Sequence, residues 1–130
     1  MARMRTKGFR VVLWHQDESD VNQKDPSRKL PGNLYAQYLR QVIRQSQCEM
    51  QWALPWFVAQ ASYHVLVDEA SPDILRAQAS LWKSGVALQG PDTDALKVPL
   101  RESNGQGVHF SREGLYAHAA ASAQYLLLWI

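Results

Sequence analysis

Residues 14–20, which read WHQDESD, bring an imidazole, an amide and three carboxylates together in one short segment. They come directly after the apolar run of residues 11–14, which is typical of a buried strand. Functional groups gather beyond the carboxyl ends of the strands in a parallel sheet, so we expect a site here. A solvated polar loop would have the same composition. The carboxylates lack the spacing of a calcium loop, and no Cys/His spacing matches zinc, so we predict no metal ion.

A second segment able to do chemistry lies near the C-terminus, where residues 107–118 read GVHFSREGLYAH. His109 stands two residues before Ser111, which is a suitable N-cap for the helix that follows. A neutral imidazole just outside a helix start, facing a crevice at the strand ends, can take a proton from a hydroxyl. Without further evidence, a histidine in this position is more often a surface residue before a capped helix than a catalytic base.

Taken together, the two segments resemble the SGNH-type carbohydrate esterases, and in particular the sialate O-acetylesterase and acetylxylan esterase family. That family has WHQGESD where this chain has WHQDESD, and commonly DGVHFS where this chain has QGVHFS. The segments FVAQASYH (57–64) and GPDTD (90–94) are also similar to segments of this family. The resemblance runs from about residue 11 to residue 118, which is most of the chain.

The resemblance implies an enzyme that removes acetyl groups from carbohydrates with a serine nucleophile, a histidine base and an oxyanion hole. By position, His109 matches the base, and Gln16 matches the side-chain amide that donates to the oxyanion. Glu18 matches the motif glutamate, which orients its neighbours. The side chains of His109 and Gln16 should then meet in one crevice. No cofactor is implied, and the partner of an active enzyme would be an acetylated carbohydrate.

The chain departs from the family at the nucleophile, which lies there in a Gly-x-Ser turn upstream of WHQ. This chain has about ten residues in that place and no serine among them. Asp17 replaces the family glycine and would repel a developing oxyanion. Gln106 stands where many members have the triad acid, and an amide can orient the imidazole but cannot stabilise an imidazolium. Asp92 or Asp94, beyond the third strand, could supply that acid. We therefore expect an incomplete or weakly active esterase.

The elements that must position these residues alternate along the chain. The apolar spacing predicts strands at residues 11–14, 56–59 and 86–88, the last closed by Gly90-Pro91. It predicts a helix with its apolar stripe over 34–43, a helix from Ser71-Pro72-Asp73 to about Gly85, and, after a long loop, a helix capped by Ser111. This β-α-β-α-β-loop-α order predicts an α/β fold with a parallel sheet between two helical layers. The resemblance makes it a flavodoxin-like, three-layer SGNH sheet, truncated to about three strands.

The periodicity also predicts which helical side chains are buried. The helix predicted from Ser71 to about Gly85 should bury Ile74, Leu75, Ala79 and Trp82. The helix capped by Ser111 should place Leu115, Ala119, Ser122 and Leu126 on its inner face.

Length and composition limit what the protein can be. The 130 residues predict one SGNH-like domain, the C-terminal portion of the fold, with residues 1–8 as a flexible basic leader. Fourteen Lys and Arg against twelve Asp and Glu give a net charge of +2, which predicts no nucleic-acid partner. The longest apolar stretches, such as 126–130, are far shorter than the roughly 20 residues of a membrane span. Cys48 forms no intramolecular disulfide and is expected to be partly buried.

No apolar h-region follows the basic leader, so these residues are not expected to be a signal peptide. The chain as given is expected to be cytoplasmic, whereas the family that it resembles is often secreted or periplasmic.

Other interpretations remain beside the incomplete esterase. The chain could be a non-catalytic interaction or carbohydrate-binding domain of the same fold, with Trp14, Trp52, Trp56 and Trp82 as its aromatic surface. It could also be a hydrolase that completes its site from a second chain. Because the strands that would adjoin the first strand are absent, we expect a homo-oligomer joined along that open edge or through the exposed helix layer. Ser62 stands in no glycine-flanked elbow and is not expected to be the nucleophile.

Overall fold

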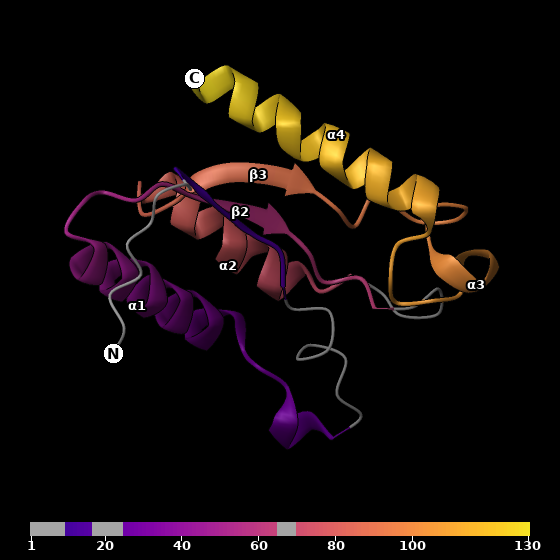
Figure 1. The fold of residues 1–130 in the computed structure, drawn as a ribbon. Helices are drawn as coiled ribbons and strands as arrows, with labels where there is room; N and C mark the ends of the chain where they lie inside the picture. Colours follow the sequence, from indigo (N-terminus) through magenta and orange to yellow (C-terminus); the bar gives the residue numbers. More distant parts are fainter. Residues whose placement is uncertain (1–9, 17–24, 65–69) are drawn as a thin grey trace.

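The computed structural model describes residues 10–16, 25–64 and 70–130, and within them strands alternate with helices (Figure 1). The elements are, in order, β1 (Val12–Trp14), the 3-10 helix η1 (Pro26–Arg28), α1 (Gly32–Met50), β2 (Trp56–Gln60), α2 (Pro72–Lys83), β3 (Leu88–Asp92), α3 (Glu102–Gly105) and α4 (Arg112–Trp129). The order predicted from the sequence is confirmed, apart from the short helices η1, before α1, and α3, in the loop before α4.

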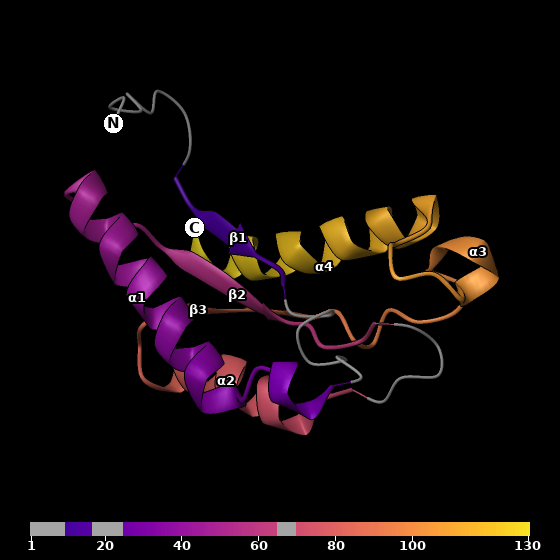
Figure 2. The same ribbon diagram turned by 90° about the horizontal axis from the view of Figure 1, so that it is seen from below.

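The three strands form one parallel sheet in the order β1-β2-β3, which confirms the predicted α/β class and the narrow parallel sheet. Val12 is paired with Trp56 across the first pair of strands, and Phe57 with Leu88 across the second. Within the described residues, β1 has a partner strand along one edge only. Figures 1 and 2 show α1 and α2 on one side of this sheet and α4 on the other.

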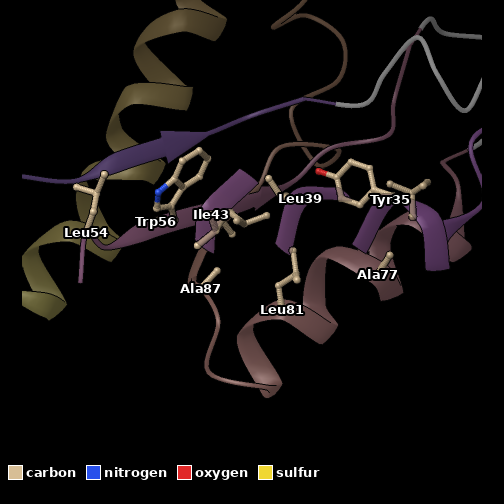
Figure 3. Close-up of a cluster of buried hydrophobic side chains, with 10 residues drawn as sticks. Tyr35, Leu39, Ile43, Leu54, Trp56, Ala77, Leu81 and Ala87 are labelled. Carbon is tan, nitrogen blue, oxygen red and sulfur yellow. The ribbon is translucent and has the colours of Figure 1, made fainter. Parts of the chain in front are cut away.

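The apolar core lies between the sheet and the pair of helices α1 and α2 (Figure 3). Ile43 and Leu81, one from each helix, are fully buried there. Trp56 of β2 packs into the same core, and Trp14 of β1 lies against it with ring centroids 5.5 Å apart. The Trp14 indole also donates to the Tyr35 hydroxyl of α1 at 3.3 Å. These contacts fix β1 and β2 against α1.

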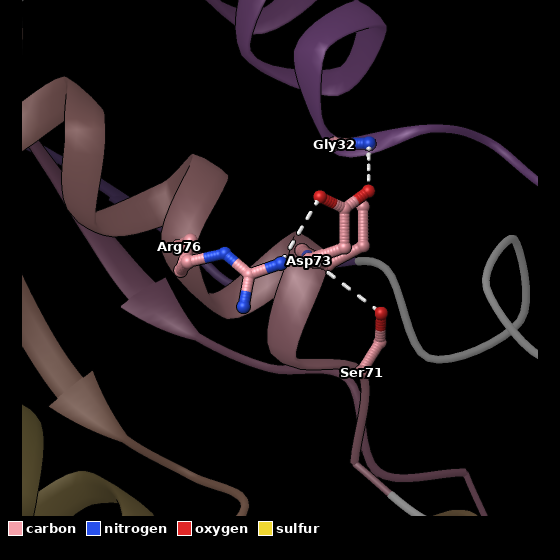
Figure 4. Close-up of polar contacts among 5 residues, drawn as sticks. Gly32, Ser71, Asp73 and Arg76 are labelled. Atoms are coloured by element: carbon pink, nitrogen blue, oxygen red, sulfur yellow. Dashed lines mark hydrogen bonds and ion pairs between the residues drawn. The ribbon is translucent and has the colours of Figure 1, made fainter.

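Helix α2 begins as its sequence predicts (Figure 4). The Ser71 side chain accepts a hydrogen bond from the Ile74 N–H, and Pro72 occupies the first helical position. The Asp73 carboxylate accepts from the Gly32 N–H at 2.6 Å, which joins the start of α2 to the start of α1. A Cβ at Gly32 would lie 2.6 Å from the Asp73 carbonyl oxygen, so this close approach requires glycine.

Strand β3 differs from the prediction, because it begins at Leu88 rather than Val86 and runs through Gly90-Pro91 instead of ending there. Gly90 allows β3 to lie close to β2, since a Cβ at this position would come within 2.8 Å of the Ala59 nitrogen. The register between the two strands shifts at the same point. Proline is tolerated because β3 is an edge strand.

Two predictions of helix burial need correction. In α2 only Ile74 of the four predicted residues is fully buried, with Ala77, Gln78 and Leu81 as its buried neighbours; the other three are partly buried, and Trp82 packs against the core. In α4 the only fully buried residue is Gly114; of the four predicted residues, Ser122 and Leu126 are partly buried, whereas Leu115 and Ala119 are exposed. Gly114 can face inward because it has no Cβ, which would collide there with the Leu100 carbonyl oxygen.

Cys48 is exposed rather than partly buried. Among the described helices, none has both the length and the apolar character needed to cross a bilayer.

Candidate functional site

The loops that follow the three strands meet at one edge of the sheet, as the parallel arrangement requires. His15 follows β1, and its Nε2 lies 2.8 Å from the Oγ1 of Thr93, which follows β3. The Thr93 hydroxyl donates to the carbonyl oxygen of Gln60, at the end of β2, at 2.8 Å. Because this hydroxyl hydrogen is already used, His15 Nε2 is assigned as the donor to Thr93. The carboxyl ends of all three strands are thus joined by one chain of hydrogen bonds.

A hollow of about 500 Å³ opens beside His15. We call it the histidine hollow, because imidazoles from three separate segments line it together with one arginine and three apolar side chains: His15, His109, His118, Arg101, Val108, Phe110 and Leu115. The rings of His15 and His118 lie 4.9 Å apart, and Phe110 stacks on His118 at 5.1 Å. His118 of α4 was given no role from the sequence, although it is the last residue of the segment GVHFSREGLYAH.

Arg101 is the buried cation of this hollow, with 2% of its surface exposed. Its guanidinium lies 4.1 Å from the centroid of the Phe110 ring and 4.8 Å from that of Tyr63. Sequence reasoning missed Arg101, since an arginine in a long loop has no local pattern that marks it as buried.

His109, the predicted base, lines the histidine hollow and is an exposed residue. Its carbonyl oxygen accepts from the Glu102 N–H at 3.0 Å, which places it beside α3. Gln106, the predicted partner of the imidazole, is exposed, and its main-chain N–H donates to the Ser103 carbonyl at 3.2 Å. No bond between the side chains of Gln106 and His109 is present in the described part of the chain.

Gln16, the predicted oxyanion donor, lines a different hollow of about 120 Å³, together with Trp14 and residues of α1. Its carbonyl oxygen accepts from the Gln78 side chain of α2 at 3.3 Å. Because α1 and α4 lie on opposite sides of the sheet, Gln16 and His109 line hollows on opposite sides (Figure 1). The shared crevice expected from the sequence is therefore not seen. Glu18 and Asp17 lie outside the described residues.

The two aspartates considered as triad acids bind the strand-end loops instead. The Asp94 carboxylate, 6% exposed, accepts from the N–H groups of Ser62 and Tyr63 at 2.8 Å each and from the Ser62 hydroxyl at 2.6 Å. Asp92 is exposed and accepts from the Asp94 N–H at 3.0 Å. Across the described ranges, neither carboxylate forms a bond with His109.

The described lining of the histidine hollow contains no serine hydroxyl and no cysteine thiol. Ser62 is fully buried, and besides its bond to Asp94 it accepts from the Ser71 N–H at 2.8 Å. Ser111 caps α4 as predicted, accepting from the Gly114 N–H at 3.1 Å. In the part of the chain that the structure describes, no three His, Cys, Asp or Glu side chains are grouped to hold a metal ion.

The tryptophans proposed as an aromatic surface are mostly covered. Trp56 is 7% exposed, Trp14 and Trp82 are half-buried, and Trp52 is 42% exposed. Of these four, Trp52 alone presents its ring to solvent to any large extent.

Comparisons with protein-family models, with curated proteins and with solved structures find no match to this chain. The resemblance to the carbohydrate esterases therefore depends on the motifs quoted above. The candidate site is identified from the arrangement of its residues in the structure.

Proposed function

We propose that this chain is the histidine-bearing portion of an SGNH-type carbohydrate esterase of flavodoxin-like, three-layer architecture, and that it has little or no hydrolytic activity by itself. The histidine hollow is the observation that carries the proposal. It brings three imidazoles together at the carboxyl ends of the strands, and its described lining offers no nucleophile. The ligand of this hollow would be an acetylated carbohydrate.

Acyl transfer needs a nucleophile, a base and oxyanion donors within reach of one carbonyl group. His109 can serve as the base, and His15 Nε2 lies within hydrogen-bond distance of the Thr93 hydroxyl. Gln16 lines the hollow on the other side of the sheet and is not among the residues that line the histidine hollow. Loss of a single catalytic group costs about 10⁴ in rate in the serine proteases. Two such groups, the nucleophile and the oxyanion donor, are missing from the described lining of the hollow.

Hydrolysis of an acetylated xylo-oligosaccharide tests the inactivity of the isolated chain. We expect release of acetate no faster than in buffer, and the same result for His109→Ala. An acceleration that His109→Ala removes while the fold is kept would contradict the proposal. A serine-directed phosphonate followed by intact mass measurement should give no adduct, and an adduct would identify an activated serine.

Binding tests the ligand class. Titration with acetylated xylose should move the imidazole resonances of His109 and His118 in NMR spectra, whereas deacetylated xylose should not. If the sugar instead moved only the indole resonance of Trp52, the non-catalytic carbohydrate-binding alternative would replace the esterase proposal. The absence of any shift would reject both.

We also propose that two copies of the chain associate along the edge of β1 that has no partner strand among the described residues. Large apolar side chains are exposed on both sides of this edge: Leu13 (51%) on β1, and Tyr38 (51%) and Val42 (46%) on α1. An unpaired strand edge flanked by apolar surface favours addition of another strand.

Light scattering over a concentration series tests the association. We expect a dimer that Leu13→Lys dissociates and Leu128→Lys on α4 does not. Dissociation by Leu128→Lys alone would assign the contact to the exposed helix layer, and a monomeric wild type at micromolar concentration would reject self-association.

A further inference from the structure

We infer that Arg101 is a positioning residue, which holds the segment carrying His109 against the carboxyl end of β3 and so sets the place of His109 in the histidine hollow. The effect on catalysis rests on the proposed esterase function, whereas the positioning itself does not.

The side chain of Arg101 connects two segments through main-chain carbonyl groups. On one side, its Nη1 donates to the carbonyl oxygen of Val108, directly before His109, at 2.7 Å. On the other side, Nε donates to Leu96 at 2.8 Å and Nη2 to Thr93 at 3.3 Å. Thr93 also binds His15, so a continuous set of contacts runs from His15 through Thr93 and Arg101 to the His109 segment.

The other described hydrogen bonds of this segment lead elsewhere. The His109 carbonyl accepts from the Glu102 N–H, and the Ser111 N–H donates to the Leu100 carbonyl at 2.9 Å. These bonds join the histidine segment to residues 100–102, which lie next to Arg101 in the sequence. The Ser111 hydroxyl also donates to the Pro99 carbonyl at 3.5 Å. Among these hydrogen bonds, those of the Arg101 side chain are the ones that reach residues 93–96, directly after β3.

The guanidinium group suits this role for chemical reasons. It is planar, stays protonated, and has donors that point in different directions, so it can serve three carbonyl groups at once. It also packs on the Phe110 ring at 4.1 Å, and Phe110 in turn stacks on His118. A lysine ammonium is a single point charge that cannot reproduce this fork.

The experiment follows the imidazole resonances of His109 and His118 by NMR in Arg101→Met. We expect both to shift. Arg101→Met removes three charged hydrogen bonds, and one of them holds Val108, directly before His109. Loss of this one bond should make the Glu102 amide, which donates to His109, exchange about tenfold to a hundredfold faster. Two controls should leave the imidazole resonances in place. Arg112→Met removes an exposed arginine three residues after His109. Leu81→Ala destabilises the core on the other side of the sheet.

Unchanged His109 and His118 resonances in folded Arg101→Met would overturn the inference. If that variant fails to fold, Arg101→Lys keeps the charge and should shift the same resonances in the same direction by a smaller amount. Wild-type resonances in Arg101→Lys would equally overturn it. Failure of the proposed function is separate, since it would be seen as no response of the wild type to acetylated xylose.

Discussion

Replacement of Asp94 by asparagine should loosen the loops that follow β2 and β3. The Asp94 carboxylate accepts three hydrogen bonds, from two N–H groups and the hydroxyl of Ser62. In Asp94→Asn, the amide oxygen can keep the two N–H bonds as neutral ones, while the Ser62 hydroxyl faces an NH₂ group in place of its acceptor. A hydrogen bond to a charged group contributes about 1.5–3 kcal/mol and a neutral one about 0.5–1.5 kcal/mol. At about 1 kcal/mol for each bond, the free energy of unfolding should fall by about 2–3 kcal/mol.

Urea unfolding followed by circular dichroism measures this loss, provided that the slope of the transition is unchanged. Domains of this size are stable by about 5–15 kcal/mol, so Asp94→Asn should remain folded in water. Asp92→Asn is the matched control, because Asp92 is exposed and accepts a single N–H bond, from Asp94. In Asp92→Asn the free energy of unfolding should fall by less than about 1 kcal/mol. Equal losses in the two variants would refute the assignment of Asp94 as the group that joins the loops.

Three further predictions concern packing and charge. Gly114→Ala should lower the melting temperature or prevent folding, because its Cβ would lie 1.9 Å from the Leu100 carbonyl oxygen. Leu81→Ala should lower the free energy of unfolding by about 2–5 kcal/mol in urea, and a loss below about 1 kcal/mol would contradict the packing of this fully buried side chain. The Asp25 carboxylate accepts hydrogen bonds from Ser27, and these lower its pKa; the bond from the hydroxyl has the larger effect and the bond from the N–H the smaller. The contact therefore stabilises the η1 turn at pH values above the ordinary pKa of an aspartate, and this stabilisation is lost as the pH falls through the lowered pKa of Asp25. Ser27→Ala should therefore raise the pKa of Asp25 in an NMR titration, and an unchanged pKa would refute this cause.

Elements with local signals could be predicted from the sequence. The start of α2 needs only Ser71, Pro72 and Asp73, whose effects act within one helical turn, and the structure agrees there. The inward face of α4 could not be predicted, because it depends on the close approach of Gly114 to a loop fourteen residues earlier in the sequence, at Leu100. Apolar periodicity alone favoured the face that includes Leu115, which is exposed.

The candidate site was predicted in part. The sequence indicated that polar groups after β1 and near His109 would gather at the strand ends, and His15 and His109 do line one hollow. The meeting of Gln16 with His109 was not seen, and side-chain alternation along an extended chain explains the difference. His15 points to the side of α4, so Gln16, one residue later, points to the side of α1. Arg101 had no local signal, since its burial depends on carbonyl groups five to eight residues away along the chain, at Thr93, Leu96 and Val108.

The indole pair of Trp14 and Trp56 gives β1 its own optical signal. The two rings lie 5.5 Å apart at an angle of 43°, one on β1 and one on β2. Transitions of chromophores this close couple, and the coupling disappears when they separate by a few ångströms or rotate. Circular dichroism in the indole bands should therefore report whether β1 stays in place on β2, without any label on the strand.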